Sequence, residues 1–258
     1  MSRHERLSAI LGIVVEEGSV HIDDIITRLG VSAATARRDL DLLADQQLVT
    51  RTRGGASANP TSGELPLRYR PSRMAREKTR IARAAAAMVS PGDSVGLNGG
   101  TTTTEIAREI ALLPELTDPE TPVTVTTNAI NIASELAVRQ CVRVVVTGGA
   151  ARAHSFELTG PLSELILPSI TIGTLFLGVE GIDEHGTYTP HESLAAVNAA
   201  LVRAARRVVA VCDHTKLGAS AFALISRLDQ IDLLITDDGA DPAVIERLQR
   251  AGLEVRLV

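Results

Sequence analysis

Hydrophobic positions in the first 57 residues recur at helical spacing, with aliphatic side chains three or four positions apart. The predicted helices span residues 6–16, 21–29 and 32–46. Gly18 and Gly30 follow the first two and are typical helix ends. Residues 48–51 then favour a strand, and residues 51–55 contain the glycines of a turn. Two short helices across a tight turn, followed by a hairpin, are typical of a winged helix-turn-helix.

From residue 92 onward, short apolar runs alternate with amphipathic stretches. The predicted strands span residues 93–97, 123–126, 142–147, 174–179, 207–212, 232–236 and 253–257. The predicted helices span residues 103–113, 128–139, 156–166, 193–206 and 241–251. This alternation predicts an α/β domain with a mostly parallel sheet covered by helices. In such a fold, ligands bind at the carboxyl ends of the strands.

Between the two regions, residues 58–73 are rich in proline, glycine, serine and arginine, which predicts a linker. The alanine-rich residues 74–89 predict a further helix. We therefore predict a winged helix-turn-helix domain over residues 1–57, a linker over residues 58–75 and an α/β domain over residues 76–258.

Composition narrows the class of protein. A length of 258 residues and a hydrophobic content of 45% fit a globular chain with room for two domains. No apolar run reaches the roughly 18–20 residues of a bilayer-spanning helix, and the N-terminus lacks the apolar core of a signal peptide. Cys141 and Cys212 lie in apolar runs, as reduced, buried cysteines do. We therefore expect a cytoplasmic protein with no membrane partner.

The formal net charge of −5 is unevenly distributed. Basic side chains outnumber acidic ones over residues 1–83, mainly because of residues 66–83, whereas acidic side chains are in excess over residues 84–258. A basic head on an acidic body is typical of a protein whose head binds nucleic acid.

Residues 32–41 (SAATARRDLD) have the pattern of a helix that lies against DNA. Ser32 is a favourable N-cap for this helix. The positions expected to face a core are Ala36, Leu40 and Leu43. The other side carries two alanines, which allow close approach to a groove floor, and the pair Arg37-Arg38. Such a pair is more often a solvated surface, but here the cap, the small residues and a basic hairpin coincide.

Each of these residues has an expected role at double-stranded operator DNA. The residues expected to reach base edges are Thr35, Arg37 and Arg38. The residues expected to contact phosphate are Ser32, Arg51 and Arg53. Asp39 and Asp41 are expected to orient the arginines through ion pairs. The complete predicted set is Ser32, Ala33, Ala34, Thr35, Arg37, Arg38, Arg51 and Arg53.

Residues 98–104 (NGGTTTT) follow a predicted strand directly and open a predicted helix. Glycines allow backbone N–H groups to turn toward a ligand, threonine hydroxyls add donors, and a helix N-terminus favours an anion. The segment lacks the Gly-Lys-Ser/Thr ending of a P-loop, and no GxGxxG motif indicates a dinucleotide. We expect it to bind phosphate; the alternative is a strand-to-helix turn capped by threonines.

Polar loops follow further predicted strands as well. Taken singly, each is more often an ordinary solvated loop, but at one edge of one sheet they indicate a small phosphorylated ligand with several hydroxyl groups. The predicted effector-binding residues are Asn98, Gly99, Gly100, Thr101, Thr102, Thr103, Thr104, Thr127, Asn128, Gly149, Arg152, Glu180, Asp183, Glu192 and Lys216.

Motifs of catalysis and of cofactor binding are missing from the sequence. There is no GxSxG or HExxH motif, and the six histidines show no metal-ligand spacing. Glu180, Asp183 and Glu192 have the chemistry of an acid and a base, but without a clear partner they are assigned to ligand binding or loop structure. We therefore predict no catalytic residue, no metal and no cofactor.

The run VSAATARRDLDLLADQQLVTRTRGGA over residues 31–56 resembles the DNA-binding signature of the DeoR family of bacterial transcriptional regulators. The resemblance continues through GDSVGLNGGTTTTEIA, TTN, GVEGID and DHTK, and so covers nearly the whole chain. It implies a repressor, usually of a carbohydrate-catabolic operon, whose operator binding is weakened by a phosphorylated sugar.

The second domain of that family is similar to ribose-5-phosphate isomerase. This resemblance implies that residues 100–104 hold the phosphate. It also implies that three side chains lie around the sugar: Asp183, Glu192 and Lys216. The catalytic lysine of the isomerase has no evident counterpart in residues 186–189, which favours sensing over catalysis.

The main hypothesis is therefore a repressor that binds DNA as a homo-oligomer, at least a dimer, and responds to a phosphorylated sugar. One alternative is a sugar-phosphate isomerase-like enzyme with an accessory DNA-binding head. Another is a DNA-bound regulator that has lost ligand sensing.

Overall fold

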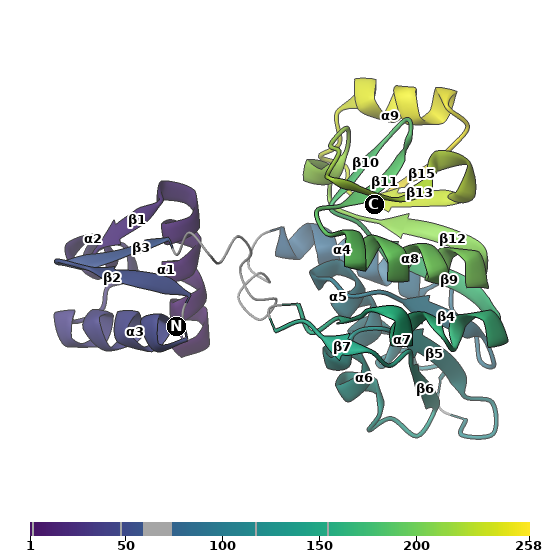
Figure 1. The fold of residues 1–258 in the computed structure, drawn as a ribbon, viewed down its shortest axis with the longest axis horizontal. Coiled ribbons are helices and arrows are strands. Elements are labelled where there is room, and N and C mark those ends of the chain that lie inside the picture. Colours follow the sequence, from purple (N-terminus) through teal and green to yellow (C-terminus); the bar gives the residue numbers. More distant parts are fainter. Residues whose placement is uncertain (2, 47, 59–73, 117, 154) are drawn as a thin grey trace. The chain divides into compact units, whose positions relative to one another are not determined.

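The computed structural model describes residues 1, 3–46, 48–58, 74–116, 118–153 and 155–258. The chain divides into two compact units, Met1–Arg73 and Met74–Val258, each with its own hydrophobic core (Figure 1). Of the predicted linker, residues 59–73 lie outside the described residues, while Ala58 ends a strand and Ala75 begins a helix.

The N-terminal unit combines helices with a small antiparallel sheet. Its described elements are α1 (Arg3–Glu17), β1 (Ser19–His21), α2 (Ile22–Leu29), α3 (Ala33–Asp45), β2 (Val49–Thr52) and β3 (Gly55–Ala58). The strand order is β1-β3-β2. The predicted helices and hairpin are confirmed. The sequence did not indicate β1, because three residues are too short to show a period, and pairing with β3 creates this strand.

The core of this unit forms where α1 packs near α3. Its buried residues include Leu7, Ile10, Leu11 and Val14 of α1 and Ala36, Leu40 and Leu43 of α3. Gly30 ends α2 in a left-handed conformation (φ 65°), which glycine adopts readily. The chain then turns to Ser32, the N-cap of α3. This is a helix-turn-helix followed by a wing, as predicted.

The second unit alternates strands and helices. Its described elements are α4 (Ala75–Ala86), β4 (Ser94–Leu97), α5 (Thr101–Ile110), β5 (Val123–Thr127), α6 (Ile130–Leu136), β6 (Val142–Val146), β7 (Ala150–Ala151), β8 (Leu158–Thr159), α7 (Pro161–Glu164), η2 (Leu167–Ser169), β9 (Ile172–Gly178), β10 (Gly181–Asp183), β11 (Gly186–Thr189), α8 (Glu192–Ala204), β12 (Ala205–Val211), η3 (His214–Lys216), β13 (Ala223–Arg227), η4 (Leu228–Gln230), β14 (Leu233–Thr236), α9 (Pro242–Arg250) and β15 (Glu254–Leu257).

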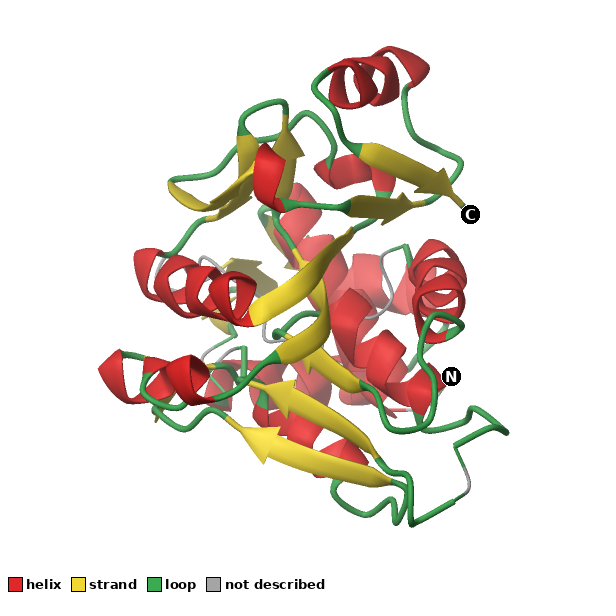
Figure 2. Cartoon of the chain, turned by 90° about the vertical axis from the view of Figure 1, so that its right-hand side faces the viewer, coloured by secondary structure: helices red, strands yellow, loops and turns green. Residues whose placement is uncertain are grey.

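Seven strands form one parallel sheet in the order β15-β14-β12-β9-β4-β5-β6, with helices on both sides (Figure 2). The core on one face contains residues of α4, α5 and α6, and the core on the other contains residues of α8 and α9. Along β9, Leu175 and Leu177 join the second core while Phe176 joins the first, as strand alternation requires.

The order of strands creates a switch point between β4 and β9. The chain builds outward from β4 to β6 and then returns to β9, from which it builds in the opposite direction. The crevice at the carboxyl ends of two such strands is the usual ligand position in open α/β sheets.

All seven predicted strands are present with small shifts of their ends. The helix predicted over residues 156–166 is wrong, because β8 pairs with β7 and only α7 is helical there. Gly160 has φ 90° and proline follows it, so a helix cannot run through this point. The sequence also did not indicate the sheet β10-β11-β13, whose short strands form through long-range pairing. No helix in the described ranges has both the length and the apolar composition needed to cross a bilayer.

Candidate functional site

Helix α3 begins at a side-chain cap. Oγ of Ser32 accepts a hydrogen bond from the backbone N of Thr35 at 3.2 Å and lies 2.9 Å from its Oγ1. This cap satisfies one of the free N–H groups of the first turn. It also fixes Ser32 and Thr35, two of the predicted DNA-binding residues, at the start of the helix.

The outer face of α3 is exposed and carries cations. Ala34, Arg37 and Arg38 are exposed, whereas Ala33 and Thr35 are half-buried. Within the described part of the chain, neither arginine forms an ion pair or a hydrogen bond. Both guanidinium groups are therefore available to an external anion or to base edges.

Asp39 does not orient these arginines, so this part of the sequence prediction is wrong. It is 2% exposed, and its carboxylate receives two hydrogen bonds from Arg6 of α1, from Nε at 2.5 Å and from Nη2 at 3.2 Å. The reason is geometric, because one residue advances the helix by about 100° and turns Asp39 inward while Arg38 points outward. The ion pair instead fixes α3 against α1.

Asp41 orients an arginine of the wing, in agreement with the sequence prediction. Its Oδ1 lies 2.9 Å from Nε of Arg51, whose Nη1 also donates to the carbonyl of Gly55. Arg53 follows at the exposed turn of the hairpin and has no ion-pair partner among the described residues. The wing thus carries one arginine tied to α3 and one that is free.

The exposed ridge of α3 changes character along its length. Helical periodicity aligns Ala34, Arg38, Asp41 and Asp45 on the side opposite the core, and all four are exposed. The first half of this ridge is small and basic, and the second half is acidic. The first half is therefore the part that suits a DNA groove.

In the second unit, Asn98 joins the two strands at the switch point. Its Nδ2 donates to the carbonyl of Gly178 at 2.9 Å, and its Oδ1 accepts from the N of Gly178 at 2.7 Å. The side chain is 1% exposed. Asn98 was predicted to bind a ligand, but the structure uses both ends of its amide to hold β4 against β9.

The loop after Asn98 leads directly into α5. Gly100 is the N-cap with φ 149°, and no side chain caps the helix. A helix N-terminus of this kind offers backbone N–H groups and a positive dipole end to an anion. At Gly99, an added Cβ would lie 2.2 Å from Cγ of Glu157, so a larger residue would displace this side chain.

The four threonines of this loop divide into two pairs. Thr103 and Thr104 direct their hydroxyls to the carbonyl of Gly100, at 3.2 and 2.6 Å, and Thr104 also accepts from Asn131 at 2.9 Å. These two stabilise the turn. Thr101 is half-buried and Thr102 is 8% exposed. Their hydroxyls form no hydrogen bond among the described residues, so these two threonines are the candidates of this loop for ligand binding.

The ends of β5 and β6 supply further predicted residues. Oγ1 of Thr127 accepts from the N of Ala129 at 3.0 Å, so its hydroxyl is used in a turn. Asn128 is fully buried, and its Oδ1 has no hydrogen-bond partner among the described residues. Its Nδ2 donates to the carbonyl of Leu158 at 3.3 Å, so the side chain is held against β8. Gly149 packs against Ser163 where no Cβ fits, and Arg152 is half-buried nearby in the chain.

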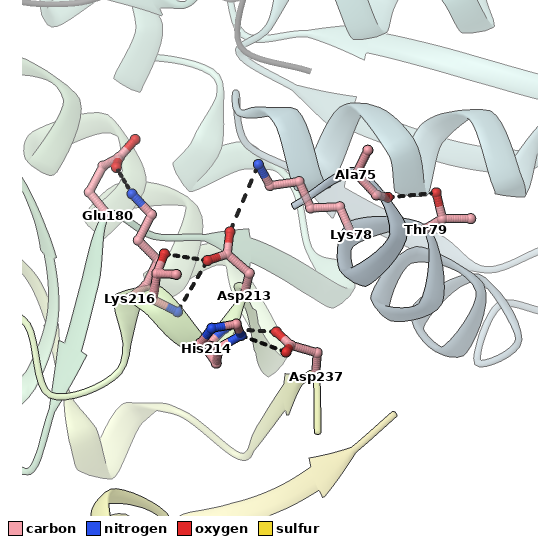
Figure 3. Close-up of polar contacts among 9 residues, drawn as sticks. Ala75, Lys78, Thr79, Glu180, Asp213, His214, Lys216 and Asp237 are labelled. Carbon is pink, nitrogen blue, oxygen red and sulfur yellow. Dashed lines mark hydrogen bonds and ion pairs between the residues drawn. The ribbon is translucent and has the colours of Figure 1, made fainter. Parts of the chain in front are cut away.

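The ends of β9 and β12 carry two ion pairs (Figure 3). Nζ of Lys216 lies 2.5 Å from Oε2 of Glu180. Asp213 accepts hydrogen bonds from the N and Oγ1 of Thr215, and its Oδ2 lies 3.8 Å from Nζ of Lys78 on α4. The structure thus brings the predicted residues Glu180 and Lys216 together. It also pairs Asp213, which follows the same strand as Lys216, with Lys78, which the sequence did not indicate.

His214 and Asp237 form a third pair at this edge (Figure 3). Asp237 accepts from the N of His214 at 2.8 Å, lies 2.6 Å from its Nδ1 and accepts from the N of Gly239 at 3.1 Å. Burial alone raises the pKa of Asp237, but these hydrogen bonds outweigh it and hold the pKa below its ordinary value.

Two predicted effector residues are not joined to this network. Oδ1 of Asp183 accepts from the N of His185, the N of Gly186 and the hydroxyl of Tyr188, which closes the β10–β11 turn. Glu192 is the exposed first residue of α8. Among the described residues, neither forms a hydrogen bond or ion pair with the side chains at the carboxyl ends of β4, β9 and β12.

Sequence reasoning missed four side chains at this edge: Lys78, Glu157, His214 and Asp237. Lys78 belongs to a helix that carries several exposed arginines, so nothing local marked it. Asp237 directly follows the predicted strand 232–236, which is a signal that the strand-end argument could have used.

Comparison of the structure with solved proteins finds distant matches. The chain matches ribose 5-phosphate isomerase A of Methanocaldococcus jannaschii with a TM-score of 0.41 and 16% identity, over 55% of this chain and 54% of that one. It matches the sorbitol operon regulator SorC of Klebsiella pneumoniae with a TM-score of 0.43 and 13% identity, over 96% of this chain and 99% of that one.

Comparison of the sequence gives matches over its full length. The chain is 35% identical to the HTH-type transcriptional repressor GlcR of Bacillus subtilis, over 99% of this chain and 96% of that protein. It is 31% identical to the HTH-type transcriptional regulator UlaR of Salmonella arizonae, over 99% of each.

Two family models also match, one in each unit. A DeoR-like helix-turn-helix domain covers residues 6–62, and a DeoR C terminal sensor domain covers residues 73–238, more than half of the chain. Together with the full-length relatives, these matches show that the protein belongs to the DeoR family.

Proposed function

We propose that this protein is a transcriptional repressor of a carbohydrate-catabolic operon, and that a phosphorylated sugar relieves its binding to operator DNA. The observation that carries the proposal is the exposed, unpaired arginine pair on a capped α3, in a chain of the DeoR family. The names of the relatives, which are repressors and regulators, agree with it. Such a protein works in the cytoplasm, where its operator lies.

At the DNA, the first half of α3 enters the major groove. Arg37, Arg38 and Thr35 reach base edges, and the small Ala33 and Ala34 allow the close approach. Phosphates are contacted by Ser32, Arg51 and Arg53. A single α3 reads only one half-site, so the protein acts as a homo-oligomer, at least a dimer, on half-sites about 34–36 Å apart.

In the second unit (Met74–Val258, called the sensor unit from here on), the phosphate of the effector lies at the N-terminus of α5. Support comes from the first turn of α5, which has no side-chain cap, and from Gly100, which leads into it. Glu180 and Lys216 offer a carboxylate and an ammonium to the ligand. Arg152 and Glu157 complete the polar set on the side of β6.

The alternative is an isomerase-like enzyme with an accessory DNA-binding head. The full-length relatives are named as regulators, and the sequence offers no counterpart for the catalytic lysine of the isomerase in residues 186–189. Both observations favour the repressor over the enzyme.

The proposal is tested by fluorescence anisotropy with the full-length protein and labelled DNA from upstream of its own and neighbouring genes. The ligands are glucose 6-phosphate, fructose 6-phosphate, ribose 5-phosphate, the matching free sugars and inorganic phosphate. We expect specific, salt-sensitive binding with a Kd of about 10⁻⁸ M or tighter, weakened by one phosphorylated sugar and not by its free sugar. Turnover of one compound without DNA binding would establish the enzyme instead.

Two variants separate the ligand site from the DNA site. Lys216→Met should keep operator affinity and lose most of the response to the phosphorylated sugar. Arg250→Met is the matched control, because it removes an exposed cation of the same unit that pairs only locally with Glu246 at 3.2 Å. Equal responses of the two variants would remove Lys216 from the ligand site.

A further inference from the structure

A buried ion pair connects the ligand edge of the sheet to the helix at which the sensor unit begins (Figure 3). The side chains of Lys78 and Asp213 are 11% and 4% exposed, and Nζ and Oδ2 are 3.8 Å apart. Hydrogen bonds between such groups are about 2.7–3.2 Å long, so Lys78 and Asp213 form an ion pair without a direct hydrogen bond. A competing anion displaces the carboxylate from such an ion pair more easily than from a pair that is also hydrogen-bonded.

On one side, Asp213 is fastened to the segment that carries Lys216. Oδ1 of Asp213 accepts from the N of Thr215 at 3.2 Å and from its Oγ1 at 2.5 Å, which caps η3. Lys216 ends η3 and pairs with Glu180 at 2.5 Å. Asp213 and Lys216 are thus parts of one short capped segment, and a ligand that engages Lys216 binds next to the carboxylate of Asp213.

On the other side, Lys78 lies one helical turn after Met74, the first residue of the sensor unit. The N of Lys78 donates to the carbonyl of Met74 at 3.0 Å. Met74 has φ 56° and ψ 37°, a left-handed conformation that is strained in a residue with a side chain. Such strain persists only while neighbouring contacts hold the residue in place.

We propose that Lys78 is a positioning residue that couples ligand binding at the carboxyl edge to the conformation of Met74. The inference rests on the proposed function, since it explains how that ligand affects the segment leading to the DNA-binding unit. Without ligand, the Lys78–Asp213 pair holds the first turn of α4 and the strained Met74. With an anionic ligand at the edge, the pair opens and Met74 relaxes. The two-state element is this first turn.

The coupling is first tested without any ligand. The chain contains no tryptophan, so Ala75→Trp places a single fluorophore at the exposed first residue of α4. In that background, Lys78→Met leaves a buried carboxylate unpaired and is prone to unfold. The informative variant is therefore Lys78→Met with Asp213→Asn, since asparagine retains an oxygen that accepts from Thr215.

We expect the double variant to change acrylamide quenching of the introduced tryptophan by about twofold or more, as an opened first turn becomes more mobile. Lys78→Arg should keep the quenching of the parent. Arg80→Met is the matched control, because it removes an exposed cation on the same helix, whose pair with Asp238 is 2.7 Å long. Quenching that is the same in the double variant and the parent overturns the inference.

The second test uses the full chain without the tryptophan, operator DNA and whichever of glucose 6-phosphate, fructose 6-phosphate and ribose 5-phosphate releases the wild type. Where the sugar phosphate weakens wild-type operator binding by about tenfold, we expect less than about twofold for Lys78→Met with Asp213→Asn. Because the pair is already open in the double variant, its operator affinity without ligand should fall toward that of the wild type with ligand bound. Lys78→Arg and Arg80→Met should keep the full response. Full release of the double variant overturns the inference. If no sugar phosphate releases the wild type, the proposed function fails, and the tryptophan experiment still decides the coupling.

Discussion

The two units of this protein use charged side chains in opposite ways. In the N-terminal unit, Arg37, Arg38 and Arg53 are exposed and have no ion-pair partner among the described residues. In the sensor unit, Lys78 and Lys216 lie at a sheet edge and are paired with carboxylates. A free surface cation costs little in water and is ready for a polyanion. A cation that is already paired must leave its carboxylate to bind a ligand, so ligand binding changes the local structure.

The same contrast occurs within one turn of α3. Arg38 is exposed and free, while the next residue, Asp39, is buried against Arg6. The Arg6–Asp39 pair fixes the position of α3, and α3 in turn positions the exposed Arg38. A charge that supports the fold and a charge proposed to bind DNA thus occupy consecutive positions, Asp39 and Arg38.

The largest expected effect is on the buried pair. Arg6→Met leaves Asp39 buried without its cation, which should lower the free energy of unfolding by about 3 kcal/mol. Urea unfolding followed by circular dichroism at fixed protein concentration measures the change. Arg28→Met is the control, because the Arg28–Glu17 pair is 46% and 45% exposed and such pairs contribute little. Equal midpoints for the two variants would contradict the supporting role of Arg6.

An intermediate effect is expected at the free arginines. Arg38→Ala should cost about 1–3 kcal/mol of operator binding and relax the sequence preference at one position. Arg53→Ala should instead weaken binding to all sequences alike and reduce the salt slope by about 1, since it contacts phosphate. Anisotropy titrations at several salt concentrations distinguish the two. Both variants should unfold like the wild type, and a large loss of stability in either would remove the contrast.

The smallest expected effect concerns the pair between His214 and Asp237. The pKa of Asp237 is lower in the folded protein than its ordinary value of 3.8, because hydrogen bonds from His214 and Gly239 outweigh burial. The ionised carboxylate therefore stabilises the fold above about pH 4, and this contribution is lost as the pH falls through the lowered pKa. Asp237→Asn should show a shallower loss of stability below about pH 4 than the wild type. Unfolding midpoints between pH 3 and 7 check this, and identical pH profiles would exclude the contribution.

Much of the architecture could be predicted from local pattern. Most strands of the parallel sheet contain a buried apolar run, although the edge strand β15 is largely exposed. Helix α3 was recognised from its N-cap Ser32 and its inward-facing apolar positions. The helix expected over residues 156–166 failed because apolar spacing there concealed a break at Gly160 and Pro161. The sheet β10-β11-β13 was missed because β13 joins its partner strands from far along the chain.

The candidate ligand site was predicted in part for the same reason. A glycine-rich loop between a strand and a helix is a local feature, so residues 98–104 were recognised. The sequence did not show which of these residues stabilise the loop, because the hydrogen-bond partners of Asn98 and Thr104 lie on β9 and α6. The ion pair of Lys78 could not be predicted, since its partner is a carboxylate at the end of β12, far along the chain.

The sequence by itself determined the order of elements, the helix expected to face DNA and the edge of the sheet at which a ligand site should be sought. These follow from spacing along the chain, because helices and strands repeat over a few residues. Only the tertiary structure decided which charges meet: Arg6 with Asp39, Lys78 with Asp213 and Lys216 with Glu180. Ion pairs act between atoms a few ångströms apart, and only folding brings residues from distant parts of the chain to that distance.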